Sequence, residues 1–409
     1  MEKLIDRPSY VEELLHHKDV DLVKIVTGIR RSGKSSILDL FHQKLLELGV
    51  DPDHIIHMNM ESLRYNNLKD FREFYQYVAE KIPQQGRTYL IFDELQVVSA
   101  WEKAIESFRL DFDVDIYITG SNAYMLSTDF STYLAGRYIE IKVLPLSFKE
   151  FISFNEFPEG TSLTDKFKKY LEIGGMPVLK DYSFSQIRTY QALEGIYSTV
   201  ILKDILQRNS QTDQNLLQKI FLFICSSIGS IASPNSIGGV LSNAGEIATG
   251  KVKATAGKTV ERYLDMLVKA FICYPVSRFD VKGKQLLKTL GKYYLVDLGF
   301  RHMLLGNRSQ DMGHLIENVV FLELLRRHYK VYIGKVDDTE VDFIAEKVNE
   351  RIYFQVSLSL LDETTYEREL RPLRKIKDNY PKMVLTMEPI VCGSDQGIEI
   401  VNLLDWLIE

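Results

Sequence analysis

A glycine-containing loop between two apolar segments constrains this chain more than any other feature. It lies in the sequence KIVTGIRRSGKSSIL at positions 24–38. Gly28, Gly33, Lys34 and Ser35 fill the P-loop (Walker A) pattern G-x-x-x-x-G-K-[ST]. In this motif backbone N–H groups surround the phosphates of a nucleotide, the lysine meets the β and γ oxygens, and the hydroxyl ligates Mg²⁺.

The segments on either side of the loop fit this interpretation. Val23–Thr27 is rich in β-branched residues, as in a buried strand, and 36–46 has apolar residues at helical spacing. The loop would then present its anion site at a helix N-terminus. An incidental glycine loop between strand and helix is the alternative. We predict a nucleotide site whose binding set also includes Arg31, Ser32 and Ser36.

Length and composition limit the class of protein. A chain of 409 residues with 45% hydrophobic residues allows two to four domains with sizeable cores. It contains no run of about 18 apolar residues, and the N-terminal MEKLIDRPSY has charges where a secretory segment is apolar. We therefore expect a soluble cytoplasmic protein that does not associate with membranes.

The three cysteines, Cys225, Cys273 and Cys392, lie far apart, without a C-x-x-C pair. This spacing indicates neither a disulfide framework nor a zinc site. We expect buried structural thiols.

An acidic pair follows a second apolar strand, Tyr89–Phe92. Asp93 and Glu94 would lie at the carboxyl end of this strand, about sixty residues after the phosphate loop. Asp93 would hold Mg²⁺, and Glu94 would polarise the water that attacks the γ-phosphate. A solvated strand end that carries two carboxylates is the alternative.

Two further candidates follow. The strand predicted at 114–119 ends near Ser121 and Asn122, which would touch the γ-phosphate or the attacking water, or else belong to a turn or helix cap. Arg137 precedes a strand predicted at 138–143. It is either an ordinary solvated arginine or, in a ring of identical subunits, an arginine finger that reaches the γ-phosphate of a neighbour.

The segments around this core read as mostly helical. A lead-in helix is expected to begin with Ser9 as its cap. Residues 151–210 read as helix with a break at 174–177, GGMP. We interpret this part as a lid or linker for the nucleotide site.

Between Lys251 and Lys292 the chain is locally basic, with ten Lys and Arg against three acids, although its net charge is −6. Short helices, a second helix at 255–268 and two strands joined by a basic turn, 281–284, have the order of a winged helix. A protein-binding winged helix with a solvated basic surface is nearly as well supported as a DNA-binding one, and Tyr263 fits a phosphate contact or the core. We predict DNA-phosphate contacts from Lys258, Arg262, Lys269, Lys282 and Lys284.

The last hundred residues contain a weaker set of acids. A helix at 314–327 carries Glu317, and the strands predicted at 340–345 and 353–358 carry Asp342 and Gln355. This order is that of the PD-(D/E)xK nucleases, whose acids bind Mg²⁺ and whose lysine helps to activate water. Ser357 stands at the lysine position, so we predict a degenerate site. The helix at 367–377 should bury Leu370, Leu373 and Ile376.

Several segments together resemble a prokaryotic AAA+ family with an AAA_14-like ATPase domain and a C-terminal DUF4143 region. The resemblance rests on GIRRSGKSS, YLIFDELQ, IYITGSN, LAGRYIEIKVLPLSFKEF, YLEIGGMPVL, YSTVILKDI, YLVDLGFRHML and GHLIENVVFLEL. It implies an α/β protein that binds ATP in preference to GTP, with a winged helix and a restriction-endonuclease-like C-terminus. The expected domains are an ATPase domain at 1–150, a lid or linker at 151–215, a winged helix at 216–305 and a PD-(D/E)xK-like domain at 306–409.

Three functional hypotheses follow. The first is an ATP-hydrolysing protein whose C-terminal modules bind nucleic acid, with DNA preferred, in a nucleotide-dependent way. The second is a nucleotide-gated signalling or scaffold protein that binds a protein partner. The third is a metal-dependent nuclease that uses Glu317 and Asp342, which the serine at position 357 disfavours.

Overall fold

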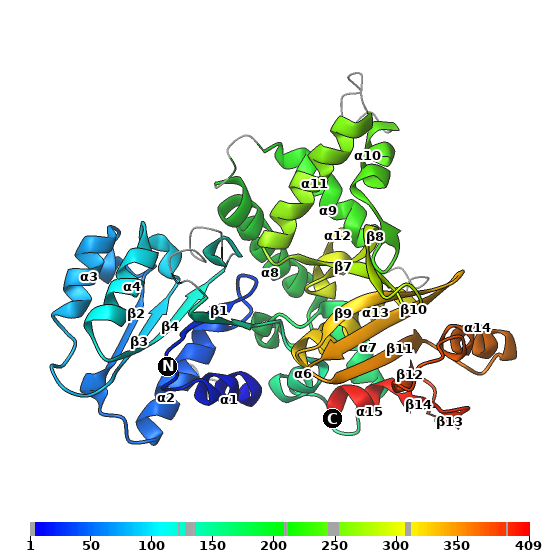
Figure 1. Ribbon diagram of the computed structural model, residues 1–409, viewed down its shortest axis with the longest axis horizontal. Helices are drawn as coiled ribbons and strands as arrows, with labels where there is room; N and C mark the ends of the chain where they lie inside the picture. Colours follow the sequence, from blue (N-terminus) through cyan, green and yellow to red (C-terminus); the bar gives the residue numbers. More distant parts are fainter. Residues whose placement is uncertain are drawn as a thin grey trace. The chain divides into compact units, whose positions relative to one another are not determined.

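The computed structural model describes residues 5–121, 123–126, 134, 136–207, 209, 212–243, 253–306, 312–389 and 392–409. The chain divides into two compact units, one of residues 1–143 with 269–271 and one of residues 144–268 with 272–409 (Figure 1). Each unit has its own β-sheet and its own buried apolar core. No helix formed by these described residues is long and apolar enough to cross a membrane.

The first unit is built on five parallel strands in the order β2-β3-β4-β1-β5. Strands β1 and β3 are buried along their whole length, because helices cover both faces of the sheet. The predicted strands are confirmed to within two residues at each end. Their bounds are β1 Val23–Thr27, β2 Ile55–Asn59, β3 Thr88–Asp93, β4 Val114–Gly120 and β5 Tyr138–Lys142.

Two pairs of helices sandwich this sheet (Figure 1). Helices α1 and α2 pack on one face through a core around Phe41, and α3 and α4 pack on the other around Phe74 and Phe108. The helices are α1 Pro8–His16, α2 Lys34–Glu47, α3 Phe71–Ala79 and α4 Trp101–Asp111, with short 3₁₀ segments η1 Pro52–His54, η2 Leu63–Tyr65, η3 Leu95–Val97 and η4 Ala123–Leu126.

The predicted cap of the first helix is wrong. Arg7 is the N-cap residue of α1, Pro8 opens the helix, and Ser9 lies inside the first turn. Proline is favoured at the first helical position because its missing N–H has no partner there in any case. The proline therefore sets the start of the helix one residue before the serine that suggested a cap.

The second unit begins with a helical part. Its helices are α6 Phe148–Phe154, α7 Leu163–Ile173, η5 Pro177–Tyr182, α8 Gln186–Thr199, the π-helix η6 Val200–Leu206, α9 Gln214–Ser226, α10 Pro234–Asn243, α11 Lys253–Lys269 and α12 Leu298–Leu305. The C-terminal part adds α13 Met312–Arg326, α14 Glu363–Arg374 and α15 Leu403–Ile408.

A single nine-stranded sheet runs through the second unit in the order β13-β14-β12-β11-β10-β9-β7-β8-β6. Strand β7 pairs in parallel with β9, so the hairpin expected as the wing belongs to the same sheet as the strands expected to be nuclease-like. The strands are β6 Ile231–Ala232, β7 Cys273–Asp280, β8 Gln285–Leu295, β9 Lys330–Val336, β10 Thr339–Lys347, β11 Glu350–Ser357, β12 Lys382–Thr386, β13 Gly393–Asp395 and β14 Ile398–Asn402.

The break predicted after α7 is present and is held by a buried aspartate. Gly174 ends the helix with φ +84, and a Cβ there would lie 1.9 Å from Oδ1 of Asp297. The Asp297 carboxylate accepts hydrogen bonds from the backbone N–H of Gly175, at 2.6 Å, and of Gly299, at 2.8 Å. Two of the sequence segments behind the family resemblance therefore meet at this carboxylate.

Two smaller expectations have mixed outcomes. Leu370, Leu373 and Ile376 are buried beneath the charged face of α14, as predicted. Cys225 and Cys273 are buried, but Cys392 is exposed, so the expectation of buried thiols is wrong at that position.

Candidate functional site

The phosphate loop connects the carboxyl end of β1 to the first turn of α2. Gly28, Arg31 and Gly33 have φ of +143, +70 and +97, so the loop winds back on itself. A Cβ at Gly28 would lie 2.2 Å from the carbonyl oxygen of Val143, which leaves room for glycine only. The resulting concave turn ahead of a helix N-terminus is suited to bind phosphate.

Polar groups of the loop are arranged around this turn. The Lys34 ammonium is buried and donates to the carbonyl oxygens of Gly28, at 3.0 Å, and Ile29, at 3.1 Å. Ser35 and Ser36 are exposed in the first turn of α2. The Ser32 hydroxyl is buried and has no hydrogen-bond partner among the described residues. A buried hydroxyl of this kind is what a polyanionic ligand would satisfy.

Arg7 holds the loop from outside the motif. Its Nη1 donates to the carbonyl oxygen of Ser32 at 2.9 Å, and its guanidinium stacks on the Tyr10 ring at 4.5 Å. Arg7 was not predicted, because nothing in its local sequence distinguishes a buried arginine from the usual solvated one.

The acidic pair lies at the carboxyl end of β3, between two polar side chains of the neighbouring strands. Asp93 Oδ1 accepts from the Thr119 hydroxyl on β4, and Oδ2 accepts from the Asn59 amide on β2 at 2.6 Å. The Thr119 hydroxyl also accepts from the backbone N–H of Glu94 at 2.8 Å. Thr119 and Asn59 therefore orient the acidic pair, and both were missed from the sequence.

Glu94 has an environment that differs from that of an ordinary strand end. Its backbone is left-handed, with φ +54, and its side chain is only 8% exposed. Burial raises the pKa of the Glu94 carboxyl, and the charge of Lys34 opposes this rise. The Gln96 amide on η3 donates to the carboxylate. A carboxylate that is buried and held near a phosphate-binding lysine is suited to act on a water molecule.

The residues present fit ATP with Mg²⁺. Ser35 and Asp93 supply a hydroxyl and a carboxylate, the oxygen ligands that Mg²⁺ takes, and the waters and phosphates usually complete its coordination. The loop lies after β1 and the acidic pair after β3, and β4 is the strand between these two. Because the strands are parallel, their carboxyl ends meet at one edge of the sheet.

The two remaining candidates of this unit have different outcomes. Asn122 lies outside the described residues, and its neighbour Ser121 is buried at the end of β4. Arg137 lies at the opposite, amino edge of the sheet, where its carbonyl oxygen accepts from the backbone N–H of Val23. Its side chain is 56% exposed and lies 3.8 Å from Glu106. Arg137 is therefore separated from the loop of its own chain by the length of β1, roughly 16 Å.

In the second unit, two predicted phosphate contacts share one helix face. Lys258 and Arg262 are exposed and four residues apart on α11, and Lys269 at its end is half-buried. Tyr263 is 2% exposed, and its hydroxyl accepts from the backbone N–H of Asp213 at 2.9 Å. Tyr263 is thus part of the core, which decides between the two roles that its sequence left open.

The turn that joins β7 and β8 contacts the end of β9. The Val281 N–H donates to the carbonyl oxygen of Lys335, and the Lys282 ammonium forms an ion pair with Asp337 at 2.6 Å. Lys284 is exposed with φ +49. The charge of Lys282 is therefore partly neutralised within the protein.

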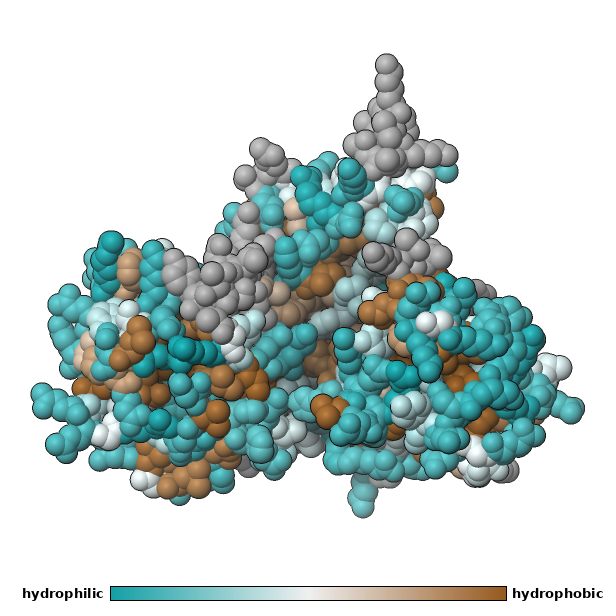
Figure 2. Space-filling model, viewed as in Figure 1, coloured by the Kyte–Doolittle hydropathy of each residue, from teal (hydrophilic) through white to brown (hydrophobic). Residues whose placement is uncertain are grey.

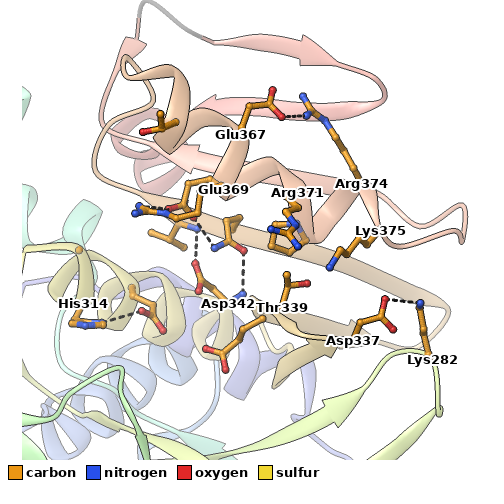
Figure 3. Close-up of a pocket in the computed structure, with 18 of the residues that line it drawn as sticks. Lys282, His314, Asp337, Thr339, Asp342, Glu367, Glu369, Arg371, Arg374 and Lys375 are labelled. Carbon is orange, nitrogen blue, oxygen red and sulfur yellow. Dashed lines mark hydrogen bonds and ion pairs between the residues drawn. The ribbon is translucent and has the colours of Figure 1, made fainter.

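The three residues of the expected nuclease-like site lie around one open pocket of about 1060 Å³ (Figure 3). Glu317 comes from α13, Asp342 from β10 and Gln355 from β11. Asp342 accepts from the Val356 N–H at 2.9 Å, and the Gln355 amide donates to Glu369 at 2.8 Å. All three residues therefore line the same pocket.

A lysine that the sequence did not point to lies beside these acids. The Lys292 ammonium on β8 is 2.8 Å from Glu317 and 2.9 Å from Glu340. Burial lowers the pKa of Lys292, but the charges of Glu317, Asp342 and Glu340 outweigh burial and raise it. Burial and the Glu317 charge hold the pKa of Asp342 well above its usual range. Among the described residues no cluster of three or more His, Cys, Asp or Glu is arranged to hold a metal ion.

Cations line the other side of the pocket. Figure 3 shows Arg371 and Arg374 on α14 and Lys375 directly after it, with Lys282 at the far end. Most of them are paired, for example Arg374 with Glu367 at 2.7 Å. The face of this unit that is seen in Figure 2 is mostly hydrophilic around β10, β11 and α14. The pocket therefore combines a buried acidic floor with a rim of paired charges.

The fold and the loop define the first unit as a P-loop ATPase domain of the AAA type. Residues 21–152 match the AAA domain family AAA_14. Residues 164–311 match a domain of unknown function, DUF8612, and not DUF4143, the region expected from the resemblance.

The chain belongs to the same family as an uncharacterized protein of Haemophilus influenzae. The two are 37% identical over 410 residues, which cover 99% of each chain. The uncharacterized protein MJ1544 of Methanocaldococcus jannaschii is 27% identical over 399 residues, or 94% of this chain and 85% of that protein. Among solved structures, the Walker-type ATPase PABY2304 of Pyrococcus abyssi aligns over 73% of this chain and 95% of that chain, with 18% identity and a TM-score of 0.47.

Proposed function

We propose that this protein binds and hydrolyses ATP, and that its second unit couples the nucleotide state to binding of DNA. The proposal that the protein hydrolyses ATP rests on four hydrogen-bonded residues, Asn59, Asp93, Thr119 and Glu94. They lie at the carboxyl edge of the sheet, where β1 leads into the phosphate loop. An ordinary solvated strand end would not need two neighbouring strands to orient its carboxylates.

The proposed roles follow from the chemistry of each group. Loop N–H groups and Lys34 bind the phosphates, and the charge of Lys34 offsets the negative charge that builds on them. When Mg²⁺ is bound by Ser35 and Asp93, it neutralises phosphate oxygens. Glu94 accepts a hydrogen bond from the attacking water and turns its lone pair toward the γ-phosphorus. Asn122 stays the candidate for sensing the γ-phosphate.

Equilibrium binding of a fluorescent ATP analogue tests the phosphate loop. Lys34→Ala removes the buried ammonium, and we expect the Kd to rise at least about tenfold, since a charged hydrogen bond contributes roughly 1.5–3 kcal/mol. The matched control is Lys44→Ala, an exposed lysine on the same helix α2. Equal losses in both variants, or none in either, would contradict the proposed site.

Element order supports a winged helix in the second unit. Helix α9, strand β6, helices α10 and α11 and the hairpin β7–β8 follow one another, and β8 pairs antiparallel with both β6 and β7. The exposed Lys258 and Arg262 on α11 would then face the phosphates of a duplex. Lys269 and Lys284 remain secondary candidates, and Lys282 contributes less because Asp337 already pairs with it.

Filter binding of duplex, single-stranded and branched DNA over a salt series tests this half. Each phosphate contact adds about 0.9 to the slope of log K against log salt for duplex DNA. We expect Lys258→Ala/Arg262→Ala to lower the slope by about two, while Lys168→Ala/Lys169→Ala, which removes two charges from α7, leaves it unchanged. A wild type without salt-sensitive affinity would contradict DNA binding.

One observation favours the alternative of a protein-binding scaffold. The far half of β7 pairs with β9, so the hairpin is not a free wing. In that case ATP turnover would be indifferent to DNA, and the double variant Lys258→Ala/Arg262→Ala would leave turnover unchanged.

The nuclease hypothesis is the least supported of the three. Lys292 already neutralises Glu317 and Glu340, as a bound cation would, and the Ser357 hydroxyl donates within its own chain to the carbonyl oxygen of Ser359 at 3.0 Å. We propose that this part of the second unit serves for binding or for packing within the protein, and that it does not cleave DNA. Cleavage of DNA with Mg²⁺ or Mn²⁺ that Asp342→Ala abolishes would overturn this conclusion.

A further inference from the structure

The Gln96 side chain lies against the candidate water-activating carboxylate and has an unused oxygen. Its amide nitrogen Nε2 donates to the Glu94 carboxylate, which fixes the orientation of the amide, since an ionised carboxylate can only accept. The oxygen Oε1 is buried and has no hydrogen-bond partner in the part of the chain that the structure describes. A buried acceptor without a donor costs about 1–3 kcal/mol, so its position calls for a ligand.

The surroundings place this oxygen at the edge of the sheet where the nucleotide phosphates would lie. A Cβ on Gly120, the last residue of β4, would be 3.0 Å from Oε1. The oxygen therefore lies beside the carboxyl end of β4, next to the Met125 side chain, whose sulfur would be 1.6 Å from the same Cβ. Because Nε2 and Oε1 share one carbon, Oε1 also lies close to the Glu94 carboxylate, and the charge of Lys34 acts on that carboxylate from the side of the phosphate loop.

We propose that Gln96 is a catalytic residue whose Oε1 accepts one hydrogen of the water that attacks the γ-phosphate, while Glu94 accepts the other. This inference rests on the proposed ATPase activity. A water molecule has two hydrogens, and both need acceptors if its lone pair is to point at phosphorus. The two acceptors would hold the water in line with the bond that breaks, which is the main requirement of phosphoryl transfer.

The step balances without a further reactant. The water oxygen forms a bond to the γ-phosphorus, and the bond from this phosphorus to the bridging oxygen breaks. ADP leaves with that electron pair. One water proton passes to the Glu94 carboxylate and then to solvent, and the other, held by Gln96, stays on the phosphate that forms.

Kinetics of Gln96→Met test the proposal, because methionine matches the length of glutamine and lacks both the acceptor Oε1 and the Nε2 donor to Glu94. We expect kcat for ATP to fall roughly 100-fold, the cost of a reacting group held about 1 Å out of place, while KM and the affinity for a fluorescent ATP analogue stay within about twofold of wild type. The matched control is Gln76→Met on α3, where an exposed glutamine likewise donates to a glutamate, Glu80, at 3.2 Å.

The double variant Glu94→Gln/Gln96→Met separates a shared water from independent effects. If both side chains hold one water, the double variant should be no slower than Glu94→Gln alone. If Gln96→Met keeps the wild-type kcat while Glu94→Gln lowers it, the role proposed for Gln96 is wrong and the proposed ATPase activity stands. If Gln96→Met lowers nucleotide affinity or thermal stability as much as kcat, its role is structural and the proposal fails. Wild-type turnover that Glu94→Gln does not lower would contradict the proposed function itself, and the role of Gln96 with it.

Discussion

The Thr119 hydroxyl on β4 donates to the Asp93 carboxylate on β3, and the same oxygen accepts from the backbone N–H of Glu94. A single side chain thus fixes both acidic residues, the one proposed to hold Mg²⁺ and the one proposed to act on water. Thr119 is fully buried, so no solvent molecule can take over its two hydrogen bonds.

Replacement of Thr119 by valine should therefore affect stability and turnover together. Valine keeps the shape of threonine and the β-branched preference for a strand but loses the hydroxyl. The Glu94 N–H and one Asp93 oxygen are then left without that partner, and we expect a loss of about 1–3 kcal/mol in the free energy of unfolding, measured in urea. Thr119→Ser keeps the hydroxyl and should retain most of the ATP turnover. If valine and serine have equal turnover, the hydroxyl is not what orients the pair.

Lys292 gives a second test, in the other unit. Lys292→Met removes the cation that the buried Glu317 shares with the partly exposed Glu340, and we expect a cost of about 3–5 kcal/mol in the free energy of unfolding at pH 7. The additional change Glu317→Gln removes one of the stranded charges and should restore part of this loss. Urea unfolding of the two variants measures the difference. A double variant less stable than Lys292→Met would show that the ion pair is not the source of the cost.

Asp297 predicts a specific pH dependence. Burial raises its pKa to about 7 in the folded protein, against about 3.9 for an unfolded aspartate. Between these values the folded state keeps a proton that the unfolded state releases. The stabilisation is therefore present below about pH 4 and is lost as the pH rises toward about 7. Asp297→Asn has no such proton, so its free energy of unfolding should fall less than that of the wild type over this range. Parallel curves for the two proteins would contradict the shifted pKa.

Arg137 allows a test of the predicted ring. Because it lies at the amino edge of its own sheet, it can assist hydrolysis only at the site of another copy. Arg137→Ala and Glu94→Gln should each be slow, and a mixture of the two should regain turnover, because some interfaces then combine an intact Glu94 with an intact Arg137. A mixture of Glu94→Gln and Lys34→Ala, which damages the same site in both copies, is the control. A mixture of the first two that is as slow as its components contradicts a role in trans.

Much of the nucleotide site could be predicted because its residues are close in sequence or end neighbouring strands. The phosphate loop and Asp93–Glu94 follow from local patterns, and the parallel sheet brings them to one edge. Thr119 is the polar last residue of the strand predicted at 114–119, and Asn59 follows a short apolar segment, so both could have been recognised from the sequence. Their partners became apparent only when the strand order, with β3 between β2 and β4, was known.

Other residues gave no such signal. Lys24 is the second residue of β1 and is fully buried against Asp115 on β4, and Lys292 is buried against Glu317 on α13. Lysine is ordinarily solvated, and only the tertiary partner reveals these exceptions. The continuity of the hairpin β7–β8 with the C-terminal sheet depends on pairing between distant strands, which local patterns do not encode.

ATP turnover tests the role of Glu94 and the coupling to DNA in one experiment. Phosphate release at saturating ATP and Mg²⁺, with and without duplex DNA, would be compared in the wild type, Glu94→Gln and the control Glu80→Gln at the C-cap of α3. We predict measurable turnover that DNA changes, a loss of at least about tenfold in Glu94→Gln, and no change in Glu80→Gln. Turnover that is the same in all three proteins would contradict the assignment of the site.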